Sequence, residues 1–228
     1  VPVALLLSMV ISRWVHWYCL TDRYESLHAA MSDYTWGGYA LMGAFVGCLL
    51  TACIMRLLHI SRNLPEMLDC MAVSGCAGIA VGRLASLFNS SDRGQVLENF
   101  KSLPFAYPVT NAVSGAVEYR LATFMIQAMV ALTLFLLLSI FYIRGNSQKK
   151  LRSGDTALIF VLIYGASQVV LDSTRYDSLF FRSNGFVSVV QVLGALGLGL
   201  AIFLFSRRMV KAYGLKFWQF LLCCLMHG

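Results

Sequence analysis

Long apolar segments separated by short polar loops are the dominant pattern of this chain. A helix needs about 20 apolar residues to cross a bilayer, and six segments approach or reach that length. They lie at residues 1–20, 37–58, 67–88, 121–143, 156–171 and 186–206. The sequence shows no runs of alternating hydrophobic and polar residues that are typical of a transmembrane barrel. The pattern therefore predicts an all-α, polytopic membrane bundle of about six helices.

Two stretches fall outside these segments. Residues 89–120 contain Pro104 and Pro108 and no clear span, and they are long for a loop. We expect them to form a partly ordered extracytoplasmic cap over the bundle. Residues 211–228 mix basic and aromatic side chains, which indicates an interfacial amphipathic helix. The predicted organisation is one transmembrane domain at 1–210 and a cytoplasmic tail at 211–228.

Composition supports a membrane location and restricts the partners. The chain is 58% hydrophobic and 13% charged, whereas soluble domains carry about 25% charged residues. The net charge of +7 is concentrated in short loops, so anionic lipid headgroups are expected as partners and nucleic acid is not. The seven cysteines have no metal-ligand spacing, and most lie in or near apolar segments. We expect them to be small core residues and expect no metal or cofactor.

The charges of the loops predict the orientation. Basic residues concentrate after the second, fourth and sixth segments, whereas the other loops are acidic or balanced. Because loops rich in Lys and Arg stay in the cytoplasm, both ends of the chain are predicted to be cytoplasmic. Residue 1 already lies within an apolar segment, so we expect an incomplete N-terminus. The basic loop residues are Arg56, Arg62, Arg144, Lys149, Lys150, Arg152, Arg207, Arg208, Lys211 and Lys216.

Arg83 lies near the outer end of the third segment and is the first candidate for a binding site. A guanidinium stays charged at ordinary pH, and placing it at membrane depth costs at least ~2.5–3.5 kcal/mol. It therefore requires a buried partner, a watery cavity or an anionic ligand. Gly82, Ser86 and Asn89 lie within one or two helical turns of it, and Gly78 and Gly82 are expected to allow close helix contact. The alternative is an arginine that extends outward to lipid phosphates.

Two further groups of polar residues lie at helical spacing. Gln168, Asp172 and Arg175 are spaced by four and then three residues, which places them on one helical face at the outer end of the fifth segment. They indicate either a structural ion pair or a second cationic contact near Arg83. Arg13 and His16 lie one turn apart in the first segment. A packing or cavity role is favoured for this pair, with His16 as a weak candidate for a base.

Single polar residues elsewhere receive simpler interpretations. Asp69, at the inner start of the third segment, is predicted to cap a helix N-terminus, where a carboxylate is favourable. Gln191, in the sixth segment, is predicted to connect helices by hydrogen bonds.

The residues Gly82, Arg83, Asn89 and Gly94 carry a resemblance to a known family. At the same spacing, they resemble the motif G-R-x-G-N-F-x-N-x-E-x-x-G of prolipoprotein diacylglyceryl transferase. That bacterial membrane enzyme moves diacylglyceryl from phosphatidylglycerol to the lipobox cysteine of a prelipoprotein. Weaker similarities run along most of the chain, at Arg13, Trp36-Gly37-Gly38, Asp69, Tyr142-Ile143-Arg144, Tyr164-Gly165, Asp172, Arg175 and Gln191.

The resemblance implies a site, a location and partners. Family members have seven spans and a cytoplasmic C-terminus, which fits six spans here if the first is missing. The location implied is the bacterial cytoplasmic (inner) membrane, with phosphatidylglycerol or another anionic lipid and a lipobox peptide as partners and with no cofactor. Arg83 and Arg175 would bind the lipid headgroup. The other substrate-binding positions implied are Gly82, Ser86, Asn89, Gly94, Gln168 and Asp172.

Several positions depart from the family pattern. Trp36 stands where the family has a histidine that helps to deprotonate the substrate thiol, and tryptophan cannot accept a proton. Gln168 replaces a headgroup-binding arginine, Ser91 a glutamate and Ser86 an asparagine. The base is therefore unassigned.

The departures leave other functions open. His16 and His28 are weak candidates for the missing base. A non-catalytic paralogue that binds lipid or a partner protein is the main alternative to an enzyme. A small transporter lined by Gly194, Gly197 and Gly199 is less favoured, because no inverted repeat is visible.

Overall fold

The computed structural model describes most of the chain and places each apolar segment in a helix. It describes residues 2–32, 38–61, 63–88, 94–97, 105–111, 115–148, 152–175, 178–181 and 184–213. The six predicted spans correspond to α1 (Pro2–Cys19), α3 (Leu41–Leu57), α4 (Leu64–Leu84), α5 (Thr123–Ser147), α6 (Asp155–Asp172) and α7 (Val189–Tyr213). A short helix, α2 (Leu27–Ser32), follows α1, and the 3-10 turns η1 (Thr21–Arg23) and η2 (Ala85–Phe88) follow α1 and α4.

Four helices in the described part of the chain are long and apolar enough to span a membrane. They are α5, α6, α7 and the continuous segment Leu64–Phe88 formed by α4 and η2. The apolar parts of α1 and α3, Val3–Cys19 and Leu41–Leu57, are shorter and lie near the lower limit of about 17 residues for a spanning helix. The all-α membrane fold predicted from the sequence is confirmed, with a count of six spans that is approximate.

The end of the last helix differs from the prediction. The apolar pattern predicts the sixth span at 186–206, but α7 begins at Val189 and continues to Tyr213. Lys211, assigned to the tail, therefore belongs to the same helix as the last span. The rest of the tail lies outside the described residues, so the interfacial helix and the domain boundary at residue 210 stay predictions.

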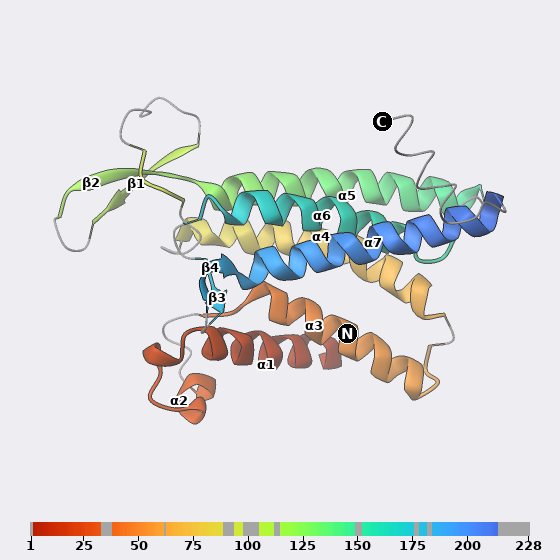
Figure 1. Cartoon of the computed structure of the whole chain (residues 1–228), viewed down its shortest axis with the longest axis horizontal. Coiled ribbons are helices and arrows are strands. Elements are labelled where there is room, and N and C mark those ends of the chain that lie inside the picture. Colours follow the sequence, from red (N-terminus) through yellow and green to blue (C-terminus); the bar gives the residue numbers. More distant parts are fainter. Residues whose placement is uncertain are drawn as a thin grey trace.

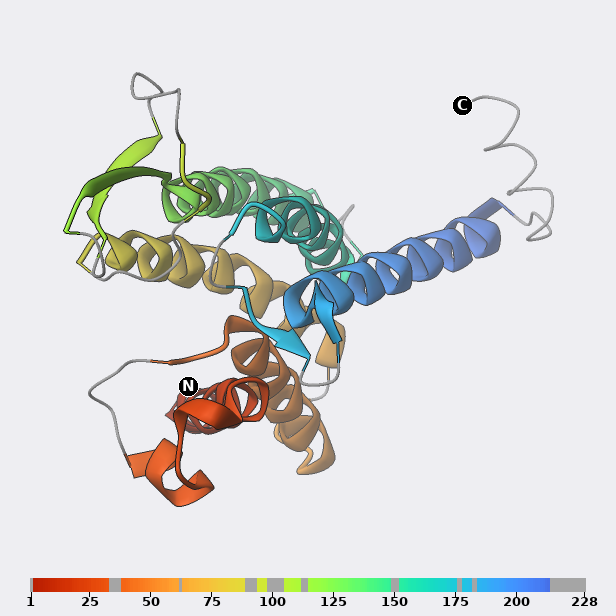
Figure 2. The same ribbon diagram turned by 60° about the vertical axis from the view of Figure 1, so that its left-hand side comes forward.

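The helices form a pair and a larger group. In Figures 1 and 2, α1 and α3 run side by side, next to a group formed by α4, α5, α6 and α7. The α1–α3 contact is close because Gly43 and Gly47, one helical turn apart, face Ser12 and Ser8. A Cβ built on either glycine would lie 2.5–2.6 Å from a serine Cα. Small residues at this spacing allow membrane helices to approach closely.

Glycines also set the distance between α6 and α7. Gly165 and Gly194 face each other, and a Cβ on either one would lie 3.1 Å from the carbonyl oxygen of the other. Gly197 packs in the same way against Val161. Helix packing therefore accounts for Gly194 and Gly197, which had suggested a transport path. The prediction of close helix contact at Gly78 and Gly82 is wrong for the described residues, since a Cβ there would meet none of their atoms within 4 Å.

Two carboxylates connect the starts of α4 and α6 with the end of α7. Buried Asp69 of α4 accepts hydrogen bonds from the N–H groups of Gly154, at 2.6 Å, and Ala157, at 2.8 Å. These donors lie at the start of α6, so Asp69 caps that helix. The predicted capping role is confirmed, with the cap on a neighbouring helix. Beside it, Arg208 of α7 pairs with Asp155 of α6.

The sequence did not predict two short hairpins at the opposite end. Strand β1 (Ala106–Thr110) pairs antiparallel with β2 (Val117–Leu121), and β3 (Phe180–Phe181) pairs with β4 (Asn184–Ser188). Figure 1 shows the β1–β2 hairpin extending beyond the N-terminal end of α5. This hairpin lies largely within residues 89–120, for which a loop cap stays a prediction.

Glu118 is held by its neighbours on the β1–β2 hairpin. Asn111 donates a side-chain hydrogen bond to it, and the guanidinium of Arg120 lies 3.2 Å from its carboxylate. These contacts favour the charged form and lower the pKa of the Glu118 carboxyl below its ordinary value, with the bond from Asn111 as the larger cause.

Candidate functional site

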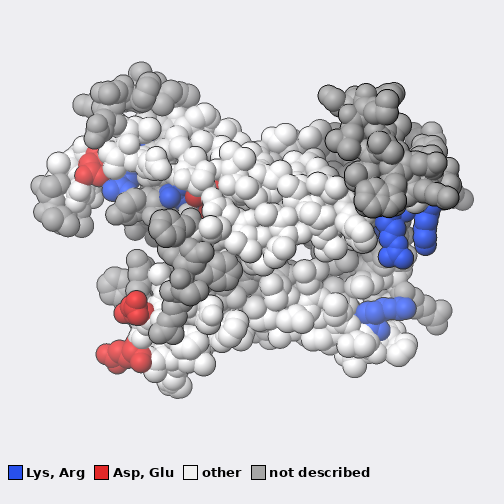
Figure 3. Space-filling view, in the orientation of Figure 1, with Lys and Arg blue, Asp and Glu red and all other residues white. Residues whose placement is uncertain are grey.

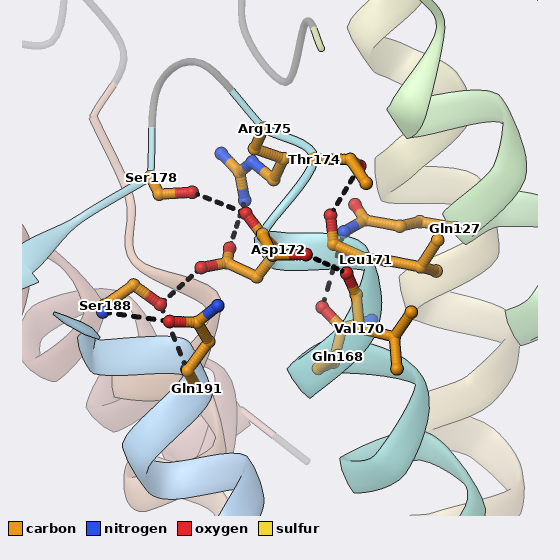
Figure 4. A network of polar contacts seen from close by, with 11 residues as sticks. Gln127, Gln168, Val170, Leu171, Asp172, Thr174, Arg175, Ser178, Ser188 and Gln191 are labelled. Carbon is orange, nitrogen blue, oxygen red and sulfur yellow. Dashed lines mark hydrogen bonds and ion pairs between the residues drawn. The ribbon is translucent and has the colours of Figure 1, made fainter. Parts of the chain in front are cut away.

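Buried polar side chains gather where α4 and α6 end and where α5 and α7 begin. Because these helices alternate in direction, residues distant in the sequence meet at this end of the bundle. Figure 4 shows part of the group, with side chains of α5, α6, α7 and the turn after α6. The buried polar residues at this end are Arg83, Ser86, Thr123, Gln127, Gln168, Asp172 and Ser188.

Arg83 occupies the last turn of α4 and is only 9% exposed. Ser86 follows in η2 and is also buried, whereas Phe88 at the end of η2 is almost fully exposed. The burial of Arg83 favours a role inside the protein over an arginine that extends into the lipid. Gly82 lies beside it in α4, and Asn89 falls outside the described residues.

Gly94, the last residue of the motif that contains Arg83, pairs with the main chain of Arg175. The main chains of Gly94 and Arg175 form an antiparallel bridge, and the N–H of Gln95 donates to the carbonyl of Thr174 at 3.2 Å. On the other side, the N–H of Gly94 donates to the carbonyl of Leu121 at 2.8 Å. The motif that contains Arg83 and the region of Arg175, which the sequence indicated as separate candidates, are therefore connected through Gly94 and Gln95.

The close approach at Gly94 explains why a glycine is needed there. A Cβ at this position would lie 2.6 Å from Oγ1 of Thr123 and 2.7 Å from Cβ of Leu121. Such contacts are too short for any side chain, so a larger residue would push the segment away from the start of α5.

Asp172 and Arg175 form the ion pair that their spacing indicated. A guanidinium nitrogen of Arg175 lies 3.7 Å from Oδ1 of Asp172, with side chains 11% and 0% exposed respectively. The other carboxylate oxygen of Asp172 accepts a hydrogen bond from the hydroxyl of Ser188. The hydroxyl of Ser178 donates to the main-chain carbonyl of Asp172 at 3.0 Å.

Gln168 lies one turn before Asp172 and faces Gln127 of α5. Both side chains are fully buried, and the amide nitrogen of Gln127 lies 3.5 Å from the amide oxygen of Gln168. No hydrogen bond from the described residues reaches the second amide atom of either side chain. The site therefore contains a neutral amide pair where the family resemblance predicts a cation at Gln168.

Ser188, like Thr123, belongs to this group but was not indicated by the sequence. Its hydroxyl accepts the main-chain N–H of Gln191 at 3.0 Å, and the side chain of Gln191 accepts the N–H of Ser188 at 3.3 Å. This reciprocal arrangement is a capping box, whose signal S-x-x-Q precedes the apolar residues of α7. Gln191 was predicted to connect helices, but these hydrogen bonds cap its own helix.

Arg13 has the packing role that the sequence favoured. It is 2% exposed and donates to the carbonyls of Ala30, at 2.6 Å, and Gly38, at 2.9 Å. Its guanidinium also lies over the rings of Tyr24 and Tyr39, at 5.3 and 5.4 Å from their centroids. Arg13 thus holds α1, α2 and the start of α3 together.

The two candidate bases lie on the α1–α2 part of the chain. His16 shares a hydrogen bond of 3.1 Å with the hydroxyl of Tyr24, next to Gly38, whose φ is +88°. A side chain at Gly38 would collide with His16 and Arg13. His28 lies exposed on α2. A role as base stays a prediction for both histidines, and Trp36 lies outside the described residues.

Comparison with known proteins identifies the family. A model of the prolipoprotein diacylglyceryl transferase family matches residues 2–221. The chain belongs to the prolipoprotein diacylglyceryl transferase family. The described residues of this family member contain no group of three or more His, Cys, Asp or Glu side chains that could hold a metal ion.

Streptococcal members of the family are similar over most of the chain. The phosphatidylglycerol–prolipoprotein diacylglyceryl transferase of Streptococcus pneumoniae (strain Hungary19A-6) is 28% identical over 183 residues, which cover 78% of this chain and 65% of the relative. The enzyme of the same name from Streptococcus equi subsp. zooepidemicus (strain H70) is 25% identical over 217 residues, covering 92% and 78% respectively. The chain thus spans about 65% of the length of the pneumococcal relative.

Proposed function

We propose that this protein transfers diacylglyceryl from phosphatidylglycerol to the cysteine thiol of a prelipoprotein. The observation that carries the proposal is the main-chain bridge between Gly94 and Arg175. It connects the family motif around Arg83 with the ion pair of Asp172 and Arg175, at one end of a membrane bundle. The names of the streptococcal relatives support the choice of substrates.

The distribution of charge supports an extracytoplasmic site in a bacterial inner membrane. In Figure 3, the visible Asp and Glu side chains lie at one end together with some Lys or Arg side chains, whereas the visible charged side chains at the end where α5 and α7 finish are all Lys or Arg. Because basic loops remain inside, the end with Arg83 and Arg175 faces outward and the C-terminus is cytoplasmic. The thiol of an exported prelipoprotein would reach the site from that side.

The chemistry proposed for the site is a displacement at carbon. The cysteine thiolate attacks the glycerol carbon that bears the phosphate, a C–S bond forms, and the C–O bond to the phosphate breaks. The leaving glycerol phosphate keeps the electron pair, and its charge is stabilised by Arg83 and Arg175. The thiol proton passes to a base, for which His16 and His28 are the weak candidates of this chain.

Gln168 and Asn89 assist in binding the headgroup under this proposal. A buried glutamine keeps hydrogen-bonding capacity but adds no charge to attract the phosphate. Two arginines, rather than three cationic groups, therefore hold the phosphate. We expect weaker headgroup binding than in family members that retain the arginine.

The test is transfer to a lipobox peptide in phosphatidylglycerol nanodiscs, followed by mass spectrometry of the thioether product. Wild type should form product, and Arg83→Ala and Arg175→Ala should each lower the rate at least about tenfold, which corresponds to 1.4 kcal/mol. Arg152→Ala, an exposed arginine at the basic end, is the matched control and should keep the rate. No product from wild type, in an assay where a streptococcal relative is active, would refute the proposal.

A non-catalytic lipid-binding paralogue is the second candidate. It is favoured by the replacement of family residues at Trp36, Gln168 and Ser91. The two functions differ in one result, since a paralogue would bind phosphatidylglycerol through Arg83 and form no thioether. Measurement of lipid binding and product in the same preparation distinguishes them.

A further inference from the structure

The hydroxyl of Ser188 connects the start of α7 to the ion pair of the site. It accepts the N–H of Gln191 within the capping box and donates to Oδ2 of Asp172. A serine hydroxyl has one proton and two acceptor sites, so both contacts can be made at once. Ser188 is 1% exposed, and water therefore does not compete for these bonds.

The carboxylate of Asp172 is held from two sides. Oδ2 receives the proton of Ser188, and Oδ1 faces the guanidinium of Arg175 at 3.7 Å. Rotation about the last side-chain bond of Asp172 moves both oxygens together. The bond to Ser188 therefore determines the direction in which the other oxygen points toward Arg175.

The main chain and the side chain of Arg175 are positioned separately. The bridge to Gly94 fixes the main chain. The side chain is 11% exposed and extends from a turn after the end of α6. The guanidinium faces the carboxylate of Asp172, which is therefore a charged group that orients it.

We propose that Ser188 is a positioning residue that orients Arg175 through Asp172 for binding an anionic lipid headgroup. The inference rests on the proposed function, because it assumes that Arg175 binds the phosphate of phosphatidylglycerol. Ser188 itself does not contact the lipid. The capping box fixes Ser188, so the first turn of α7 becomes part of the architecture that supports the site.

The experiment is calorimetric titration of the detergent-solubilised protein with short-chain phosphatidylglycerol. Ser188→Ala and Ser188→Gly both remove the hydroxyl, and glycine is well tolerated at a helix N-cap. Each is expected to weaken binding by about tenfold, a size typical of residues coupled through a shared partner. Ser188→Thr keeps a hydroxyl and should restore most of the affinity.

A control and a double variant separate positioning from general damage. Ser178→Ala removes a hydroxyl that bonds to the main-chain carbonyl of the same Asp172, and it should leave the affinity unchanged. Ser188→Gly combined with Arg175→Ala should bind no more weakly than Arg175→Ala alone, because the hydroxyl acts only through that arginine.

Two results would overturn the inference. The first is unchanged lipid affinity in Ser188→Gly when wild type binds. The second is a loss in the double variant equal to the product of the two single losses. Transfer activity measured on the same samples tests the proposed function separately, since a wild type whose lipid binding depends on Ser188 and Arg175 but that forms no thioether contradicts only that function.

Discussion

Replacement of Gly94 by alanine should separate the Arg83 segment from Arg175. The added Cβ would lie 2.6 Å from Oγ1 of Thr123 and 2.9 Å from the carbonyl oxygen of Leu121, whereas ordinary contacts lie near 3.5–4.0 Å. The segment must retreat by roughly 1 Å to relieve these contacts. That movement breaks the hydrogen bond of 2.8 Å from Gly94 to Leu121.

The expected cost combines two contributions. Overpacking of a well-packed position costs about 1–3 kcal/mol, and a lost hydrogen bond costs about 0.5–1.5 kcal/mol. Their sum is about 1.5–4.5 kcal/mol, which lowers the population of the paired conformation at least about tenfold. The bridge between Gly94 and Arg175 belongs to that conformation, so transfer to a lipobox peptide should fall by a similar factor.

The assay compares Gly94→Ala with Gly78→Ala in the same nanodiscs. A Cβ at Gly78 meets no atom of the described residues within 4 Å, and alanine is about 1 kcal/mol more favourable than glycine inside a helix. The control should therefore keep the transfer rate and unfold at the same or a higher temperature. A Gly94→Ala protein with the transfer rate of wild type would refute the steric argument.

Three further predictions concern other parts of the structure. Arg83→Lys should retain only part of the lipid affinity, and Arg83→Ala should retain less, because lysine keeps the charge without the bidentate geometry. Equal lipid affinity of Arg83→Lys and wild type in calorimetric titrations would contradict this prediction. Asp69→Ala should lower the free energy of unfolding by about 2–4 kcal/mol, because two N–H groups at the start of α6, one buried and one partly buried, lose their acceptor. Denaturant unfolding in detergent measures this change, and an unchanged free energy would exclude the capping role. Because the pKa of Glu118 is lowered in the folded protein, its carboxylate stabilises the hairpin above the unfolded pKa. This stabilisation is lost as the pH falls through the folded pKa. The protection of β2 amides against hydrogen exchange, corrected for the intrinsic pH dependence of exchange, should therefore fall on acidification, and this fall should be smaller in Asn111→Ala. An identical pH profile in that variant would argue against the Asn111 contact as the cause.

The sequence predicts the helices well because a membrane span is recognisable from its length and apolar content. The same reasoning found the Asp172–Arg175 pair, since three residues in a helix bring side chains onto one face. It also found Asp69 as a cap and Arg13 as a packing residue, because charges in apolar segments require partners inside the protein.

The features that were missed depend on contacts between distant segments. Nothing local at Gly94 indicates Thr123 and Leu121 as its neighbours, and nothing local at Gly165 indicates that it faces Gly194. The glycines that seemed suited to helix packing, Gly78 and Gly82, have open surroundings among the described residues. The capping box was different, because S-x-x-Q before the apolar residues of α7 was readable from the sequence.

The attachment of α6 to α7 at both ends has a mechanical consequence. Arg208 pairs with Asp155 at one end and Ser188 bonds to Asp172 at the other, with Gly165 on Gly194 between them. Sliding by one helical turn, about 5.4 Å, would break both carboxylate contacts at once. These contacts therefore hold the two helices in one register, and under the proposed function a two-tailed lipid that enters from the bilayer would pass between other helices than these.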